Sequence, residues 1–519
     1  MKSVEIGKSW RGLSEEIIVG MTEWRQQNPK ATFRAIEDEL DRRLSELRAR
    51  MLSDLAIASV SADWEPGPEA PVCSKCKRKL QAKGKKKREL QTRGGVNVKL
   101  EREYGICPQC GQGIFPLDEE LELLPGVLSP HGHESLVRLA CWMPFEKAAE
   151  MFEDLLGIQI SKSLSERYTE GAGAAYESLQ TAEVERLERE MPPAPAGADK
   201  LQVSADGAMV PLVHGQWVEV RTVVIGEVQP AVEERGEWVV HTRNLSYFSR
   251  RVTAEEFTRL ALVEIQKRGI ENAKEVGAVM DGADWLQGFV DYHCPQAVRI
   301  LDFPHAGEHI SPIGAFLLGE GTPEMKEWLG ERLHQLKHAG PTGLLTELRN
   351  LQKEHPDEKS VVGNLAYLEK RENQMHYPQF QAAGWPIGSG IVESGNKVVV
   401  ESRLKGAGMH WTDEHVNPML ALRNILCSDR WKADWPKIAA QLRLQNILKQ
   451  SQQHQAKLEA KAALAASLLT QALPVVEHNS AQSGVEPKQL VTPHKPSENP
   501  WRKFKFGKAL YQHPSLPKN

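Results

Sequence analysis

Two Cys-x-x-Cys pairs constrain the fold of this chain more than any other feature of its sequence. They are Cys73-Ser-Lys-Cys76 and Cys107-Pro-Gln-Cys110. Each loop can present two thiolates to one tetrahedral ion, so two such loops brought together form a closed four-sulfur zinc site. Between the pairs, polar and apolar residues alternate around Gly94 and Gly95, which predicts a β-hairpin that places the second loop beside the first.

We therefore expect one structural Zn²⁺, held by four thiolates in a zinc ribbon over residues 66–120. A thioredoxin-like redox role is the competing interpretation of a Cys-x-x-Cys motif. It is the weaker one, because a redox site of that kind needs only one such pair.

The hairpin between the cysteine pairs is dense in Lys and Arg, including the run KRKLQAKGKKKR at 77–88. The net charge of the chain is −4, so any binding of nucleic acid depends on a local excess of cations. The basic side chains that we expect to contact DNA phosphates here are Lys85, Lys86, Lys87 and Arg88. A solvated surface loop is the alternative for such a run.

Residues 134–171 have apolar positions at helical spacing with a break at Gly157, which predicts two helices joined by a short turn. Ser161 is a suitable N-cap for the second helix. If the pair is a helix-turn-helix, the second helix would reach phosphates or base edges. The side chains placed to do so are Lys162, Ser163, Ser165 and Arg167. An ordinary helical hairpin is the alternative.

From Leu201 the pattern becomes strand-like, after a Pro- and Ala-rich break at 191–199. Three apolar, β-branched runs come first: LQVSADGAMVPL, GQWVEVRTVVIGEV and EWVVHTRNLSYFSR. A helix capped at Thr253 and ended by Gly269 follows, then the strand EVGAVMDGA, the helix WLQGFVDYH and the strand AVRILDFPH. The order β-β-β-α-β-α-β is the layout of an RNase H-like domain, whose first strand lies centrally beside the fourth.

Three acidic residues are candidates for one catalytic site on this sheet. Asp206 lies on the first strand, and Asp281 ends the fourth strand, where catalytic groups gather in open sheets. Glu393 would arrive from a later helix in GSGIVESG. Taken singly, an Asp before Gly is more often a turn residue, and Glu393 could be a first-turn helix charge. Glu401, eight residues later, is a lesser candidate.

Three carboxylates suit phosphodiester chemistry because charge builds on both the attacking and the leaving oxygen. Two Mg²⁺ (or Mn²⁺) ions stabilise both oxygens, and Mg²⁺ prefers oxygen ligands. We assign the bridging position to Asp206 and the outer positions to Asp281 and Glu393.

At this point the residues resemble a known family, the DDE transposases of bacterial insertion sequences, and within it the ISKra-type group related to Mutator-like elements. The resemblance spans roughly residues 70–430. Besides the cysteine pairs, the matching segments are IFPLDE at 114–119, SADG at 204–207, VMDGADWLQGF at 279–289, LDFPHAGEHI at 301–310 and GSGIVESGNK at 388–397.

The resemblance implies that Asp206, Asp281 and Glu393 correspond to the acidic triad of the family. It also implies that Asp302-Phe-Pro-His305 is the D-x-x-H signature found after the second acid. His305 could hydrogen-bond a scissile phosphate or orient a carboxylate, or it could be a packed strand-end histidine. Asp284 and Asp302 are possible substitutes for Asp281, but only Asp281 ends its strand at the required level.

The helical pattern between 309 and 385 fits the all-helical insertion of the same family, placed before the last acid. After Glu393, Lys397, Arg403 and Lys405 with His410 and Trp411 make a basic, aromatic-bearing surface suited to DNA, or simply a solvated face. The expected parts are N-terminal helices (1–65), zinc ribbon (66–120), helical DNA-binding segment (121–192), catalytic domain (198–310), helical insertion (311–385), second catalytic part (386–447) and largely disordered tail (448–519).

The expected protein is thus a multidomain α/β transposase that binds double-stranded DNA at inverted-repeat ends, cleaves it and joins it to target DNA. It would act as a homodimer or larger assembly, because two ends must be brought together. It would be cytoplasmic and nucleoid-associated when bound to DNA, since no apolar run could span a membrane. A structure-selective RNase H-like nuclease and a catalytically silent DNA-binding regulator derived from a transposase are the alternatives.

Overall fold

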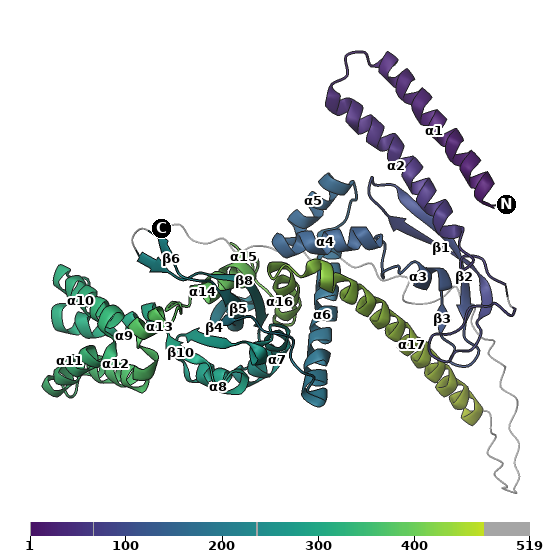
Figure 1. Cartoon of the computed structure of the whole chain (residues 1–519). Coiled ribbons are helices and arrows are strands. Elements are labelled where there is room, and N and C mark those ends of the chain that lie inside the picture. Colours follow the sequence, from purple (N-terminus) through teal and green to yellow (C-terminus); the bar gives the residue numbers. More distant parts are fainter. Residues whose placement is uncertain (1, 66, 235–236, 472–519) are drawn as a thin grey trace, which may run out of the picture. The chain divides into compact units, whose positions relative to one another are not determined.

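A computed structural model of the chain describes residues 2–65, 67–234 and 237–471 (Figure 1). The chain divides into two compact units after Lys457, and the second is described only for the end of helix α17 (Trp431–Gln471). The rest of the tail for which we predict disorder, 472–519, lies outside the described residues. None of the described helices is both long and apolar enough to cross a bilayer.

The cysteine-bearing segment forms a three-stranded antiparallel sheet, which confirms the predicted hairpin. Its strands are β1 (Gln81–Gln91), β2 (Asn97–Ile106) and β3 (Gly113–Ile114), in the order β1-β2-β3. The turn uses Gly94 and Gly95, whose φ angles of 92° and 73° favour glycine. Two long helices, α1 (Lys2–Gln27) and α2 (Phe33–Ile57), precede this sheet.

A helical segment follows the ribbon. Its helices are α3 (Pro116–Glu120), α4 (Pro130–Trp142), α5 (Phe145–Leu156) and α6 (Lys162–Glu190). The predicted break and cap are confirmed: Gly157 ends α5 in the left-handed region, and the Ser161 hydroxyl accepts a hydrogen bond from Leu164 N at 3.2 Å. Side chains of α4 and α6 share a buried apolar core with α16 (Asp413–Cys427) and the start of α17.

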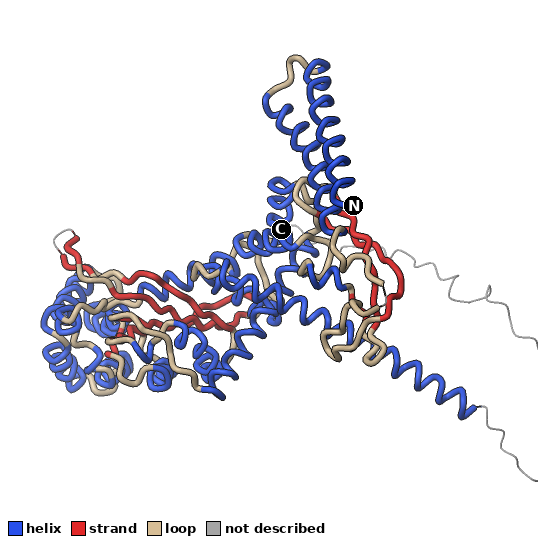
Figure 2. Tube along the Cα trace, turned by 45° about the vertical axis from the view of Figure 1, so that its right-hand side comes forward, coloured by secondary structure: helices blue, strands red, loops and turns tan. Residues whose placement is uncertain are grey.

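A mixed five-stranded sheet follows, in the order β10-β9-β4-β5-β8. Its strands are β4 (Lys200–Pro211), β5 (Trp217–Val228), β8 (Thr242–Arg250), β9 (Glu275–Met280) and β10 (Val298–Leu301). The first strand, β4, is central and parallel to the fourth, β9, and antiparallel to β5. The predicted strand order is therefore confirmed, and Figure 2 shows these strands side by side among helices.

One predicted strand is partly wrong. The run from Glu237 does not join the sheet as a single strand: β6 (Val232–Glu234) and β7 (Glu237–Val239) form a separate hairpin, and β8 begins at Thr242. The pairing of β5 with β8 ends at Val228 and Thr242. The residues between these two positions therefore form their own hairpin, β6 with β7.

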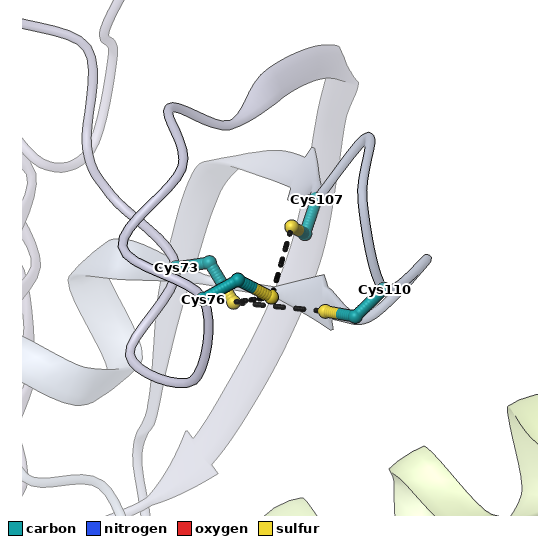
Figure 3. A group of neighbouring side chains, drawn as sticks. All are labelled: Cys73, Cys76, Cys107 and Cys110. Atoms are coloured by element: carbon teal, nitrogen blue, oxygen red, sulfur yellow. Dashed lines mark hydrogen bonds between the residues drawn. The ribbon is translucent and has the colours of Figure 1, made fainter.

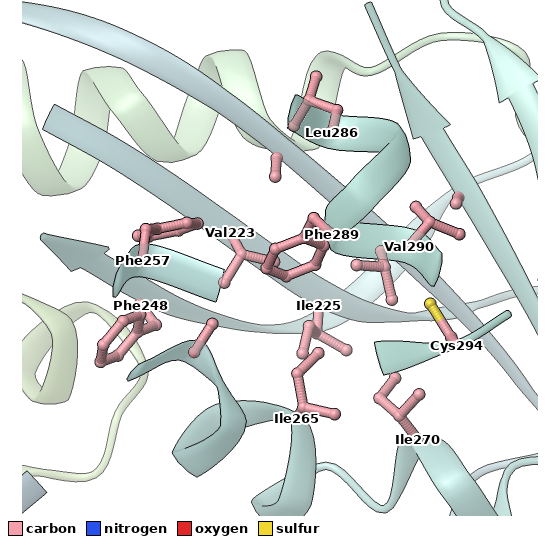
Figure 4. Close-up of a cluster of buried hydrophobic side chains, with 14 of the residues drawn as sticks. Val223, Ile225, Phe248, Phe257, Ile265, Ile270, Leu286, Phe289, Val290 and Cys294 are labelled. Atoms are coloured by element: carbon pink, nitrogen blue, oxygen red, sulfur yellow. The ribbon is translucent and has the colours of Figure 1, made fainter. Parts of the chain in front are cut away.

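Alternation along the strands divides the side chains between two faces of the sheet. On one face, Val203, Val223 and Phe289 belong to the core under α7 (Ala254–Lys267) and α8 (Asp284–His293), drawn in Figure 4. Thr253 caps α7, as predicted, by accepting from Glu256 N at 3.3 Å. On the other face, Ala208 and Val210 pack with residues of α14 (Gly390–Gly395), the π-helix η4 (Asn396–Glu401) and α15 (Ser402–Leu404).

Between β10 and α14 the chain is helical and has its own apolar core around Ile310, Leu345 and Leu365. The helices are α9 (Phe303–Leu318), α10 (Pro323–Ala339), α11 (Pro341–Glu354), α12 (Lys359–Lys370) and α13 (Tyr377–Ala382). Single turns of 3-10 helix complete the fold: η1 (Val213–Gly215), η2 (Ile270–Asn272) and η3 (Glu372–Gln374).

Candidate functional site

The four cysteines of the ribbon converge on one point (Figure 3). The Sγ atom of Cys73 lies 3.9 Å from that of Cys76 and 3.7 Å from that of Cys110. The Sγ atoms of Cys76 and Cys107 are 3.8 Å apart. Tetrahedral Zn²⁺ with bonds of about 2.3 Å places its sulfurs about 3.8 Å apart. All four thiols are free, and these separations are far longer than a disulfide bond. The group could therefore hold one structural zinc ion.

One of these thiols is prepared to lose its proton. Burial raises the pKa of Cys107, but hydrogen bonds from the backbone of Cys110 and Gln109 outweigh it and lower the pKa to about 7. Cys73 and Cys107 are fully buried, whereas Cys76 and Cys110 are partly exposed. Such a site is closed by protein ligands and leaves no open position for a substrate.

The predicted DNA contacts of the ribbon are only partly available. Lys85, Lys86 and Lys87 are exposed on β1; Lys85 pairs with Asp63 at 2.8 Å, and the Lys86 ammonium lies 3.9 Å from the centre of the Tyr104 ring. Arg88 is different: it binds Asp118 at 2.9 Å and the carbonyl of Gly126 at 3.1 Å, and its side chain is 15% exposed. We therefore correct the expectation for Arg88, which braces the ribbon internally.

The two aspartates of the sheet lie at matching levels of adjacent parallel strands. Val203 of β4 pairs with Ala278 of β9, and counting three residues onward from each reaches Asp206 and Asp281. Asp206 is half-buried, and its Oδ1 accepts a hydrogen bond from Gly207 N at 2.7 Å. Asp281 directly follows β9, and its Oδ1 accepts one from Ala283 N at 2.8 Å.

The third acid comes from a helix that packs closely on the sheet. A Cβ at Gly395 would lie 2.6 Å from Val224 of β5, so glycine is required for this approach. One residue later, Asn396 donates from Nδ2 to Asp206 Oδ2 at 3.1 Å. Glu393, on the turn before, is exposed. Asn396 thus ties the helix of Glu393 to Asp206, and the helix continues there as π-helix, a form frequent at functional sites.

The acids are close enough to affect one another electrostatically. Burial raises the pKa of Asp206, and the charges of Asp281, Glu393 and Glu219 raise it further, against the Gly207 hydrogen bond. Within the described residues, no Lys or Arg forms an ion pair with Asp206. The Oδ1 atom of Asn396 is also buried without a hydrogen-bond partner. Uncompensated carboxylates beside an orphaned amide oxygen are the ligand chemistry of a hard divalent cation.

The three acids lie less close together than the tightest groups of possible metal ligands. Among the described residues, two groups have all their ligand atoms within 4.8 Å of one another: the four cysteines, and Glu166, Glu170 and His415. The three acids are not such a group, because their ligand atoms do not all lie within 4.8 Å of one another.

A buried polar network fixes the loop that carries Asp281. Tyr367 of α12 donates its hydroxyl to the Asp281 carbonyl, and Arg371 donates Nε to the Gly282 carbonyl at 2.8 Å. The Arg371 guanidinium stacks 3.7 Å from the centre of the Tyr367 ring. The helical insertion therefore supports the acidic edge directly, a role that the sequence alone does not indicate.

Asp302 has a structural position and His305 a peripheral one. The buried Asp302 caps α9 by accepting from His305 N at 3.1 Å, and it also accepts from Ser389 N at 2.6 Å. His305 is half-exposed beside the Tyr367 ring, and its Nδ1 lies 3.0 Å from Glu308. Asp284, the other substitute for Asp281, is exposed and pairs with Lys370 at 2.7 Å.

Several predicted DNA contacts need correction. Lys162, Arg167 and Lys397 are exposed, as a phosphate contact requires, but Ser165 is fully buried. Arg403 is 2% exposed and donates Nε to the Ala140 carbonyl at 2.8 Å, so it stabilises the packing of α15 on α4.

Of the other three members of that surface, His410 is exposed, and its Nδ1 lies 3.3 Å from the Leu212 carbonyl. Lys405 pairs with Glu401 at 2.8 Å, and Trp411 is buried, so Trp411 offers no stacking surface. Aromatic and basic residue types were recognisable in the sequence, whereas their burial was not.

A group of two glutamates and a histidine, which sequence patterns did not indicate, brings together α6 and α16. Glu166 and Glu170 follow one another by one turn of α6, and His415 of α16 lies 2.9 Å from Glu170. The Thr412 hydroxyl also lies 2.9 Å from His415 Nδ1, and Glu414 lies 3.7 Å from His415 Nε2. Glu166, Glu170 and His415 are also close enough together to hold a metal ion.

Comparison with known proteins gives one result. Residues 72–433 match the model of UPF0236, an uncharacterised protein family. The matched range contains the four cysteines, both aspartates and Glu393, and leaves out α1 and α2. No curated protein matches the chain.

Proposed function

The chain belongs to the UPF0236 family, and from this premise we propose that it is a DNA transposase of the ISKra-type, Mutator-related group, with Asp206, Asp281 and Glu393 as the acids of an RNase H-like catalytic domain. The observation that carries the proposal is the matched level of Asp206 and Asp281 on two parallel strands, with Glu393 held over the same edge by the Asn396 hydrogen bond to Asp206. Burial and mutual repulsion favour a cation between these acids.

The residues divide the work as follows. Asp206, held from both sides by Gly207 and Asn396, would bridge two divalent ions, and Asp281 and Glu393 would each bind one. When bound, two Mg²⁺ ions would stabilise the attacking and leaving oxygens of the phosphodiester. Tyr367 and Arg371 keep the Asp281 loop in place. His305 has Nδ1 near Glu308, and the described residues provide no partner for its Nε2, which could donate to a phosphate oxygen when both ring nitrogens carry protons.

Recognition of DNA would fall to the exposed cations outside the sheet: Lys85, Lys86 and Lys87 on β1, Lys162 and Arg167 on α6, and Lys397 beside Glu393. Exposed lysines on a rigid strand bind phosphates without reading sequence. Zinc in the ribbon would hold β1 in shape and take no part in the chemistry.

The test uses the full-length chain, Mg²⁺ and linear DNA that carries the sequences flanking its gene. The wild type should nick this DNA at the element ends, whereas Asp206→Asn and Asp281→Asn should bind it and not cut it. Asn396→Ala should lower the rate by about 10- to 100-fold, the usual effect of losing a residue that orients a metal ligand. Asp284→Asn, one turn away and exposed, is the matched control and should cut normally.

Two results would overturn the proposal: cleavage by the Asp206→Asn protein, or the absence of Mg²⁺- or Mn²⁺-dependent cleavage by the wild type. The second result would favour a DNA-binding regulator. Pre-cut ends distinguish the remaining alternative, because a transposase joins their 3′-hydroxyls to target DNA and a structure-selective nuclease does not.

A further inference from the structure

A cleft of about 1000 Å³ opens beside the proposed active site. Gln202 of β4 lies on one wall, and the segment that leads to Glu393, including Gly390 and Ile391, forms another. Gln202 and Asp206 are four residues apart on one strand, so they project from the same face of the sheet about 13 Å apart. The cleft thus follows the face that carries Asp206 and runs toward the Glu393 helix.

The chemistry of the lining favours an anionic, flat-sided ligand. None of its described lining residues carries a carboxylate, whereas Lys337 and His338 from the end of α10 and His241 before β8 contribute basic groups. His241 also pairs with Glu234 at 2.8 Å, outside the cleft lining. Glu233 and Glu234 belong to the neighbouring hairpin but do not line the cleft, whose basic lining complements phosphate.

The rim of this cleft carries an exposed indole. Trp238 of β7 is 70% exposed, although it lines the cleft. The hairpin that bears it pairs only with itself, Glu233 opposite Trp238, so no packing requirement of the sheet explains a tryptophan there. Indole rings on a basic groove are stacking platforms for bases, and every base has a face on which to stack.

We propose that this cleft, which we call the Trp238 cleft, receives an unpaired segment of the DNA strand whose phosphate lies at the acids, with a base stacked on Trp238. The inference rests on the proposed function, because the acids define which strand this is. Stacking requires a base whose face is free, which a duplex does not offer. The roughly 13 Å between Gln202 and Asp206 corresponds to about four base steps of 3.4 Å, so the wall of the cleft formed by Gln202 lies about four base steps from Asp206.

The experiment measures binding, independently of cleavage. A fluorescein-labelled 12-nucleotide single strand of mixed sequence is titrated with the full chain without added Mg²⁺, and anisotropy is followed. Trp238→Ala should weaken binding about tenfold, as expected for one lost base stack, and Trp238→Phe should stay within about threefold of wild type. Trp217→Ala is the control, since Trp217 is also exposed, at 55%, and lies outside the cleft.

A duplex of the same sequence provides the decisive comparison. Trp238→Ala should bind it as the wild type does; an equal loss for duplex and single strand, or no loss for either, overturns the inference. The result is separable from that of the proposed function, because the assay contains no added Mg²⁺ and measures binding without cleavage. If Trp238→Ala weakens single-strand binding but the wild type does not cleave DNA, the proposed transposase activity is refuted and the DNA-binding role of the Trp238 cleft stands. If the wild type cleaves DNA and Trp238→Ala binds the single strand normally, the role of the cleft is refuted and the transposase activity stands.

Discussion

The ribbon and the five-stranded sheet are stabilised in different ways. The ribbon has two small buried cores: Trp64, Ala70, Leu80 and Ile114 with Cys73 and Cys107 of the four-sulfur group, and Leu90, Val98 and Leu100 with Ala49 of α2. The sheet core buries a larger apolar set, with Phe248, Phe257 and Phe289 at its centre. A small core seldom supplies enough apolar burial to stand alone and commonly relies on a metal. We therefore expect the folding of the ribbon to depend on zinc and the folding of the sheet to be independent of it.

The largest expected effect follows from breaking the zinc site. In the double variant Cys73→Ser, Cys107→Ser, bound zinc should fall from one ion per chain to none, and amide protection should be lost from β1 and β2 but kept in β4 and β9. Structural zinc supplies on the order of 10 kcal/mol in small domains, more than this core can replace. Zinc analysis and hydrogen exchange measure both results. Cys427→Ala is the control, and β1 amides that stay protected without zinc would contradict the comparison.

The reverse experiment opens a cavity in the sheet. Phe289 is fully buried, and its ring centre lies 6.0 Å from that of Phe257 and 4.6 Å from that of His293. Phe289→Ala should lower the free energy of unfolding of the sheet by about 3–5 kcal/mol, seen as faster exchange of β9 amides, while zinc content stays at one ion per chain. Phe316→Ala, at a site 41% exposed, should cost much less. Zinc loss in Phe289→Ala would show that the two regions unfold together.

We expect acid to destabilise a third region, the helices that follow the ribbon. His133 of α4 is 3% exposed with both ring nitrogens unpaired, and burial lowers its pKa to about 4, against about 6.5 in the unfolded chain. The unfolded state therefore takes up a proton first, so stability is full above pH 6.5 and is lost as the pH falls toward 4. The expected loss between pH 7 and pH 5 is roughly 2 kcal/mol.

Denaturant titrations monitored by exchange of α4 and α6 amides at the two pH values measure this loss. His133→Phe should remove the His133 contribution, and His131→Phe, at an exposed position, should retain it. A His131→Phe protein with a flat pH profile would refute the assignment to His133.

The smallest expected effect concerns a single helix end. Thr253→Ala removes the hydroxyl that accepts from Glu256 N at the start of α7, and should destabilise the sheet region by about 1 kcal/mol. Thr253→Ser keeps the oxygen and should restore most of this loss. Thermal unfolding of the three proteins measures the difference, and the ribbon should be indifferent to both variants.

Sequence reasoning succeeded where the signal was local. The hairpin at Gly94, the Ser161 and Thr253 caps and the strand order follow from residue patterns within one or two elements, because turns, caps and period-two alternation are local properties. The four-sulfur group was also accessible, since few folds other than a metal site use paired Cys-x-x-Cys loops.

The unpredicted features depend on contacts between distant segments. The Asn396 bond to Asp206 spans 190 residues, and the Arg403 bond to the Ala140 carbonyl spans 263. An arginine that will be buried has the same sequence signature as one that will face solvent, which is why Arg88 and Arg403 were mistaken for phosphate contacts. For the same reason Tyr367 and Arg371 gave no sign that they support Asp281.

The bond between Asp302 and Ser389 bears on how such chains can diversify. The polypeptide leaves the sheet at Asp302 and returns at Ser389, 87 residues later. Ser389 N donates to Asp302 Oδ1 at 2.6 Å, and Phe303 N donates to the Ile387 carbonyl at 3.0 Å. Lengthening a closed loop costs little entropy once its ends are joined. The helices between Asp302 and Ser389 could therefore be enlarged, shortened or exchanged while these hydrogen bonds keep Glu393 near the two aspartates. The length and sequence of these helices can therefore vary without moving the acids. The exceptions are Tyr367 and Arg371, whose hydrogen bonds to the Asp281 loop any replacement would have to provide.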